Sequence, residues 1–322
     1  MLVTVNRPKL FDHLRDGVTQ SLLLEFAACR RRAQLSYIKG YSSEYSSDAL
    51  AFGSLFHGAL EHLYNNQHLL SQLPKAWLKE TWRHIYHDYR QETERVRHWS
   101  EEDETKCNLH KAYLYLLLPV YFKKYWPQDR TKEWVKNEVV FKNVWKFNGL
   151  PFTGKFDRVA RNQHGEIWVY ETKTKSRIDP TLQDRLSFDF QSNFYMFNYW
   201  LETRVYPKGF VYDVIQRPQH RMGMKEDLPG FIKRVGEAID DTFFQRITVT
   251  RTQQELIDWV NNDLTPLTQE FLDWRAGKLA TYRNAASCET RYGACKFLKV
   301  CGLKDYRGLV RRTVLFPELA GE

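Results

Sequence analysis

The stretch Gly154-Lys155-Phe156-Asp157, followed by Glu171-Thr172-Lys173, decides the fold expected for this chain. Each stretch belongs to a run of strand-forming residues, and the turn-forming segment 162–165 separates the two runs. Because side chains two positions apart on a strand share a face, Glu171 and Lys173 point the same way. The pattern predicts a β-hairpin that brings two carboxylates and a lysine together at one end.

These residue types suit phosphodiester chemistry. Hard divalent cations prefer carboxylate and carbonyl oxygens, which Asp157, Glu171 and the carbonyl of Thr172 supply. Lys173 is placed to orient an attacking water or to stabilise developing negative charge. Lys175 repeats the spacing nearer the loop and ranks second. The alternative is a surface hairpin whose glutamate and lysine simply pair across an exposed strand.

Two helical segments carry further polar pairs. Residues 188–200 read as a helix on which Gln191 and Tyr195 share one face. Residues 52–68 read as a helix with His57 and Glu61 in the same relation, within a Gly-x-x-x-His-x-x-x-Glu pattern that starts at Gly53. Each pair alone is most often structural.

Taken in order, His57, Asp157, Glu171-Thr172-Lys173, Gln191 and Tyr195 resemble the motifs of the PD-(D/E)XK nuclease superfamily. The resemblance is to the RecB-like branch, which includes the nuclease domains of RecB and AddB, a CRISPR-associated exonuclease-type protein and phage exonucleases. It implies an α/β fold with a restriction-endonuclease-like core, in which helices flank a mixed central sheet. A helical insertion and a C-terminal iron–sulfur region would be added to that core.

The resemblance also assigns roles to these residues. It implies that Asp157, Glu171 and Thr172 hold Mg²⁺ or Mn²⁺, with His57 as an added ligand that often accompanies Mn²⁺ use. Lys173 would be the catalytic lysine. Gln191 and Tyr195 would face the DNA or steady the catalytic groups.

Cysteine placement is a second signal. Cys288, Cys295 and Cys301 lie close together near the end of the chain, and Cys29 lies far upstream. Four thiolates match the requirement of a [4Fe-4S] cluster, and some RecB-like nucleases, AddB among them, resemble this order. The Cys295-x5-Cys301 spacing fits, whereas Cys288-x6-Cys295 is wider than usual. Zinc, a disulfide or plain buried thiols are the alternatives, and Cys107 has no place in the pattern.

The positive net charge of the chain indicates the class of binding partner. The chain has 322 residues, 43% of them hydrophobic, and a formal net charge of +9, which favours a polyanion such as DNA. Residues 288–312 hold seven Lys or Arg against two acids, with aromatics interleaved, so they suit either a phosphate backbone or a solvated helical face. Neither a membrane span nor a signal peptide is evident, so we expect a soluble, cytoplasmic protein.

The periodicity predicts strands at 134–142, 144–148, 151–160, 166–174 and 208–216. Helices are expected at 17–40, 52–68, 227–246 and 252–276, with two or more across 74–126 and an end near Pro119. This divides the chain into an N-terminal segment with one cluster cysteine (1–51), the His57 helix (52–73), a helical insertion (74–133), the nuclease core (134–225) and a C-terminal cluster region (226–322).

The sequence therefore predicts a metal-dependent deoxyribonuclease, with an exonuclease acting on single-stranded DNA or DNA ends favoured. A structure-specific endonuclease is the alternative within enzymes, and a catalytically silent DNA-binding or protein-interaction module is the alternative outside them. No GxxxxGK[ST] motif is present in the sequence, so any helicase motor would be a separate chain. Recombination, repair or CRISPR adaptation would supply other partner proteins.

Overall fold

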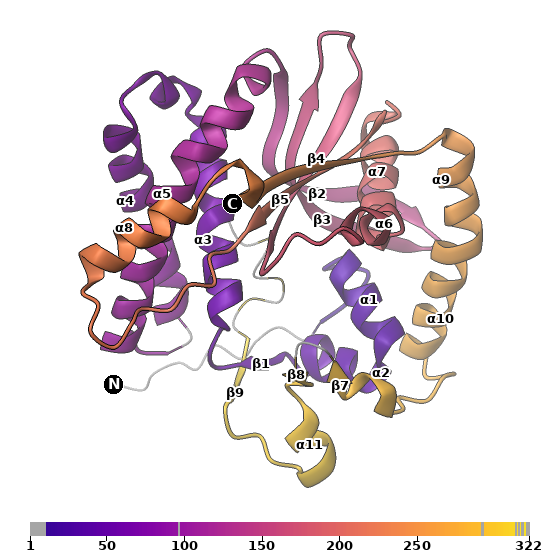
Figure 1. The fold of residues 1–322 in the computed structure, drawn as a ribbon. Coiled ribbons are helices and arrows are strands. Elements are labelled where there is room, and N and C mark those ends of the chain that lie inside the picture. The colour runs from indigo at the N-terminus through magenta and orange to yellow at the C-terminus, as the bar shows by residue number, and fades with distance from the viewer. Residues whose placement is uncertain are drawn as a thin grey trace, which may run out of the picture.

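A computed structural model describes residues 11–95, 97–290, 293–312, 314, 316 and 319, without the side chains of residues 143, 144 and 290. A mixed central sheet lies between two groups of helices (Figure 1). This confirms the predicted α/β class and its mixed, helix-flanked sheet.

The central sheet has five strands in the order β2-β3-β4-β5-β6. The strands β4 and β5 are parallel, and every other neighbouring pair is antiparallel. A parallel connection needs a crossover, which α6 (Leu182–Ser187) and α7 (Phe190–Thr203) provide. The strand bounds are Glu133–Phe147 for β2, Leu150–Arg161 for β3, Ile167–Lys175 for β4, Gly209–Gln216 for β5 and Phe244–Thr250 for β6.

Each face of the sheet has its own apolar core. On one face, residues such as Phe156, Val169 and Phe210 pack in one cluster with side chains of several helices. These include α1 (Gln20–Ala28), α7 (Phe190–Thr203), α9 (Gln253–Trp259) and α10 (Thr265–Arg275). Ile215 and Phe244 belong to the second cluster, with helices bounded by Asp48–Asn65 for α3, Pro74–Glu94 for α4, Glu101–Asp129 for α5 and Leu228–Ala238 for α8. The chain thus forms three layers, helix, sheet and helix (Figure 1).

The prediction of one helix over 227–246 is wrong in its second half. The helix α8 ends at Ala238, a 3-10 turn follows at Asp241–Phe243, and β6 then pairs with β5. Phe244, Ile247 and Val249 are buried against the sheet, and burial in a sheet overrode the weak helical periodicity. The expected boundary after residue 225 therefore separates β6 from the sheet to which it belongs.

Three smaller expectations also differ from the structure. The helix expected over 17–40 breaks at Cys29, which is extended at φ −164° and ψ 110°, and continues as α2 (Arg30–Ala33) and a π-helix (Gln34–Ile38). The strands expected at 134–142 and 144–148 are one strand, β2. The helix α5 runs through Pro119, because its buried residues on both sides of the proline continue one packed face.

The C-terminal region returns to the N-terminal region. The short strand β1 (Tyr41–Ser43) pairs antiparallel with β9 (Leu309–Arg311). Between α10 and β9 lie a 3-10 turn (Ala285–Ser287), the β7–β8 pair (Glu289–Thr290 and Gly293–Ala294) and α11 (Leu298–Leu303). None of the helices in the described part of the chain is both long and apolar enough to cross a membrane.

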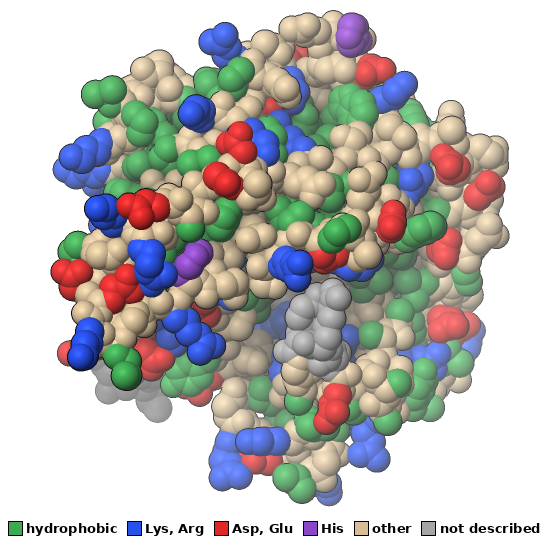
Figure 2. Space-filling view, in the orientation of Figure 1, with side chains coloured by type: hydrophobic (Ala, Val, Ile, Leu, Met, Phe, Trp, Pro, Cys, Tyr) green, Lys and Arg blue, Asp and Glu red, His purple; other side chains and the backbone are tan. Residues whose placement is uncertain are grey.

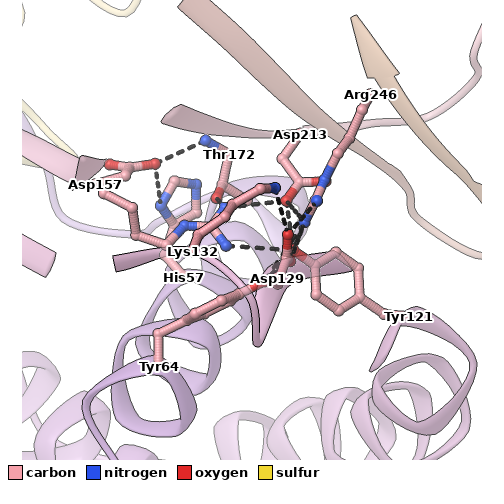
Figure 3. Close-up of polar contacts among 10 residues, drawn as sticks. His57, Tyr64, Tyr121, Asp129, Lys132, Asp157, Thr172, Asp213 and Arg246 are labelled. Carbon is pink, nitrogen blue, oxygen red and sulfur yellow. Dashed lines mark hydrogen bonds and ion pairs between the residues drawn. The ribbon is translucent and has the colours of Figure 1, made fainter. Parts of the chain in front are cut away.

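A buried polar network joins the sheet to the second helical layer. Arg158 of β3 donates to Asp213 of β5 at 3.0 Å, and Arg246 of β6 contacts Asp213 at 3.2 Å and Asp129 of α5 at 2.6 Å (Figure 3). The carboxylates of Asp129 and Asp213 are fully buried. Two tyrosine hydroxyls and an ammonium complete the network, from Tyr64, Tyr121 and Lys132.

The pKa of Asp129 sets the pH below which this network loses part of its stabilising effect. Burial alone raises the pKa of the Asp129 carboxyl, but hydrogen bonds and charge from Arg246 outweigh burial and lower the pKa to about 2. A pKa below the unfolded value of about 3.9 stabilises the folded state above that pH, and the gain disappears as the pH falls toward 2.

We therefore expect Asp129→Asn to be less stable than the wild type from neutral pH down to about pH 4. The difference in unfolding free energy should shrink between about pH 4 and pH 2, where the wild-type carboxylate takes up its proton. Urea denaturation at a series of pH values measures this difference. A difference that grows on acidification would contradict the assignment.

Candidate active site

The strands β3 and β4 separate at Asp157. Their ladder runs from Arg161 and Ile167 to Arg158 and Tyr170 and is not continued beyond that pair. The Asp157 carboxylate accepts the backbone N–H of Thr172 at 2.7 Å instead. The side chain of Asp157 is thereby held in the fork between the strands.

Glu171 and Lys173 lie next to this fork, as predicted. Lys173 Nζ is 3.2 Å from Glu171 Oε1, and the same oxygen accepts the amide N–H of Gln191 at 2.7 Å. The carbonyl oxygen of Gln191 accepts Lys173 Nζ in turn. Gln191 is at the start of α7, where the N-cap Asp189 fixes the helix end. Gln191 therefore orients both charged groups.

His57 reaches the fork from α3 on the other helical layer. Its Nδ1 is 3.3 Å from Asp157 Oδ2 (Figure 3). The helix comes close to β4 at Gly53, where an added Cβ would lie 3.1 Å from the Thr174 hydroxyl. The glycine four residues before His57 therefore permits the close approach of α3.

Glu138 of β2 completes the group and was missed in the sequence. The β2–β3 register pairs Asn137 with Arg158 and Val139 with Phe156, which places Glu138 level with Asp157. Ligand atoms of His57, Glu138 and Asp157 lie within 4.8 Å of one another, and this is the one such group of His, Cys, Asp and Glu found among the described residues. Glu138 has φ +51°, a strained value for a glutamate. No sequence pattern predicts that Glu138 belongs to the site.

Crowding of carboxylates dominates the electrostatics. Burial and the charge of Asp157 raise the pKa of both Glu138 and Glu171 well above the usual carboxyl range. Burial also raises the pKa of Asp157, against the lowering effect of the Thr172 N–H. Burial lowers the pKa of His57 to about 4, so its imidazole is neutral near pH 7. A site with clustered carboxylates and a neutral imidazole favours a bound cation.

A divalent metal fits these residues. Glu171 is 6% exposed, and its Oε2 is buried without a hydrogen-bond partner in the described structure. An unpaired buried acceptor is costly, and a cation would relieve that cost. The donors are carboxylate oxygens and an imidazole nitrogen, the set that suits Mg²⁺ or Mn²⁺.

The other predicted residues fall in two places. Thr172 donates its N–H to Asp157, and its hydroxyl accepts Arg158 at 3.0 Å, so it links the fork to the buried network. Tyr195 lies one turn beyond Gln191, with its ring 5.7 Å from Phe156 and 6.1 Å from Phe141. Its ring packs among aromatic rings of the first core.

The structure also gathers the four predicted cysteines. Cys29, at the end of α1, and Cys288, Cys295 and Cys301 line one cavity. The N–H of Asn284 points to Cys29 Sγ at 3.5 Å, and Cys295 N–H donates to the Cys288 carbonyl at 2.7 Å. Cys107 lies elsewhere, on α5, where its side chain is buried in the second apolar cluster.

The spacing of the sulfurs bears on what they can hold. Tetrahedral zinc, with Zn–S bonds of about 2.3 Å, requires sulfurs about 3.8 Å apart. No three cysteine sulfurs within the described ranges approach one another to 4.8 Å. The arrangement is thus wider than a closed zinc site.

Carboxylates, an imidazole and a lysine thus lie together at a fork between two strands of a mixed sheet. The chain belongs to the PD-(D/E)XK nuclease superfamily, whose family model matches residues 18–302.

The solved structures that resemble the chain include two at low sequence identity. One is a crystal structure named "Putative exonuclease" from Eubacterium rectale, with 11% identity, 84% of this chain and 85% of that chain covered, and a TM-score of 0.49. The other is the crystal structure of SSO0001, with 12% identity, 84% and 90% covered, and a TM-score of 0.29. No curated protein matches the sequence.

Proposed function

We propose that this protein is a metal-dependent deoxyribonuclease of the RecB-like branch that degrades DNA from its ends. The observation that carries the proposal is the convergence of Asp157, Glu171 and Lys173 where β3 and β4 separate, with His57 facing them. A purely structural hairpin has no need for a buried glutamate with an unpaired oxygen.

The residues divide the work of phosphodiester hydrolysis. Asp157, Glu171 and the Thr172 carbonyl would hold Mg²⁺ or Mn²⁺, and His57 would add a nitrogen ligand. The bound metal supplies Lewis-acid activation of water and of the phosphate. Lys173, held by Gln191, aids the attacking water or stabilises the developing negative charge.

Basic residues of the C-terminal region are suited to the DNA backbone. Lys299, Lys304 and Arg307 are exposed around α11. In Figure 2, Lys and Arg side chains gather over this part of the molecule. Their charge favours phosphate contacts of low sequence specificity.

The test is a time course on end-labelled single-stranded, linear duplex and circular DNA with Mg²⁺, Mn²⁺ or EDTA. We expect metal-dependent loss of the linear substrates while circles persist, and no loss with Asp157→Asn. Cutting of circles would indicate an endonuclease. Binding of DNA and metal without cleavage of any substrate would favour a catalytically silent module.

We also propose that the four cysteines hold a [4Fe-4S] cluster with a structural role. The common cavity supports this, as does the N–H directed at Cys29 Sγ. A cluster would tie α1 to the C-terminal region across most of the chain. Such a clip restricts the unfolded state.

Cys295→Ser tests this proposal. Anaerobically purified wild type should contain about four iron atoms and four acid-labile sulfides per chain. The variant should lose most of both and melt at a lower temperature, whereas Cys107→Ser should keep its iron. Zinc without iron in the wild type would refute the cluster.

A further inference from the structure

The fork has a second cation of its own, the ammonium of Lys155. Lys155 Nζ lies 2.6 Å from Glu138 Oε2, and the Glu138 side chain is only 9% exposed. Lys155 precedes Asp157 by two residues on β3, so the two side chains share a face. The charges of Glu61 and Asp157 also act on Lys155. The ammonium is therefore the internal counter-ion of several carboxylates.

Glu138 lies within reach of two kinds of partner, the Lys155 ammonium and a metal held by His57 and Asp157. One of its oxygens binds Lys155, while the residue also belongs to the group in which ligand atoms of His57, Glu138 and Asp157 lie within 4.8 Å. A metal that takes Glu138 as a ligand competes with the ammonium for the charge of that carboxylate.

We propose that Lys155 is a displaceable counter-cation, which neutralises Glu138 in the metal-free protein and yields that carboxylate to a divalent cation held with His57 and Asp157. This rests on the proposed function, because it concerns the same metal site. Glu138 is then a metal ligand, and Lys155 sets how tightly the site binds. The Lys155 side chain is 26% exposed, which leaves the ammonium a route toward solvent.

Equilibrium Mn²⁺ binding by calorimetry, at fixed pH and ionic strength, tests the inference. Lys155→Met should tighten Mn²⁺ binding by about tenfold, since the metal no longer competes with an ammonium. Lys155→Arg keeps the charge and should stay closer to the wild type. Lys146→Met, an exposed lysine of β2, is the surface control and should change nothing.

Glu138→Gln gives the complementary result. It should weaken Mn²⁺ binding by about tenfold, and adding Lys155→Met to it should change the affinity much less than Lys155→Met does alone. Thermal melting provides a separate readout: Lys155→Met should lower the melting temperature in EDTA and lose that deficit in saturating Mn²⁺. A purely structural Lys155 would show the same deficit in both.

Unchanged or weaker Mn²⁺ binding by a folded Lys155→Met variant overturns the inference. Should that variant fail to fold with and without Mn²⁺, Glu138→Gln decides: unchanged Mn²⁺ affinity overturns the inference, and a loss supports it. A DNA-cleavage assay of the wild type, run in parallel, separates the two proposals. If the wild type cleaves DNA but neither Lys155→Met nor Glu138→Gln changes the Mn²⁺ affinity, the counter-cation proposal is refuted and the nuclease proposal stands.

Discussion

Replacing Lys173 with methionine should lower the rate of DNA cleavage by on the order of a thousandfold. The ammonium lies 3.2 Å from Oε1 of the buried Glu171, and Gln191 holds it in place. Methionine keeps most of the apolar stem while it removes the charge. Because Lys173 pairs with Glu171 and is not itself a metal ligand, its loss should not weaken Mn²⁺ binding, so an empty metal site would not explain the slower cleavage.

Lys175→Met is the matched control, because Lys175 repeats the spacing of Lys173 at the end of β4. It should retain cleavage within about threefold. Single-turnover rates on end-labelled DNA give the comparison. Equal losses for the two variants would show that general positive charge, rather than Lys173 itself, supports the reaction.

Arg158→Met should destabilise the folded protein by about 3 kcal/mol, the lower end of the range for breaking a buried ion pair. Arg158 is 1% exposed and donates to Asp213, Thr172 and Tyr121. The substitution leaves Asp213 buried with Arg246 as its remaining cation, at 3.2 Å. That residual pairing keeps the loss from being larger.

Arg161→Met, three residues further along β3, provides the control. Its pair with Glu133 at 3.2 Å is about half exposed on both sides, and such pairs contribute about 0 to 1 kcal/mol. Urea denaturation at neutral pH measures both variants. A loss for Arg158→Met as small as that for Arg161→Met would mean that the network adds nothing to stability.

The part of the site that the sequence predicts is the part built from short-range spacing. Glu171 and Lys173 share a strand face, and the turn between β3 and β4 returns the chain beside Asp157. Gln191 needed the resemblance to a known family, because its contact with Lys173 depends on how α7 crosses the sheet. The steadying role expected of Gln191 stays a prediction that rests on its contacts with Lys173 and Glu171.

Glu138 and the buried network depend on contacts that no local pattern encodes. Glu138 sits in a strand of mixed polar and apolar residues, and only the β2–β3 register brings it level with Asp157. Asp129 and Asp213 lie far apart in sequence, in a helix and a strand, and meet through Arg246. The first residues of the strand at 244–250 were likewise expected to be helical, since their burial depends on pairing with β5.

The most direct test of the central claim compares wild type with Glu171→Gln in metal-dependent cleavage and in DNA binding. Glutamine preserves the size of the side chain and removes the charge that a metal requires. The account predicts that cleavage is lost while DNA affinity stays within about threefold. Cleavage at the wild-type rate by the folded variant would contradict it and place the chemistry elsewhere.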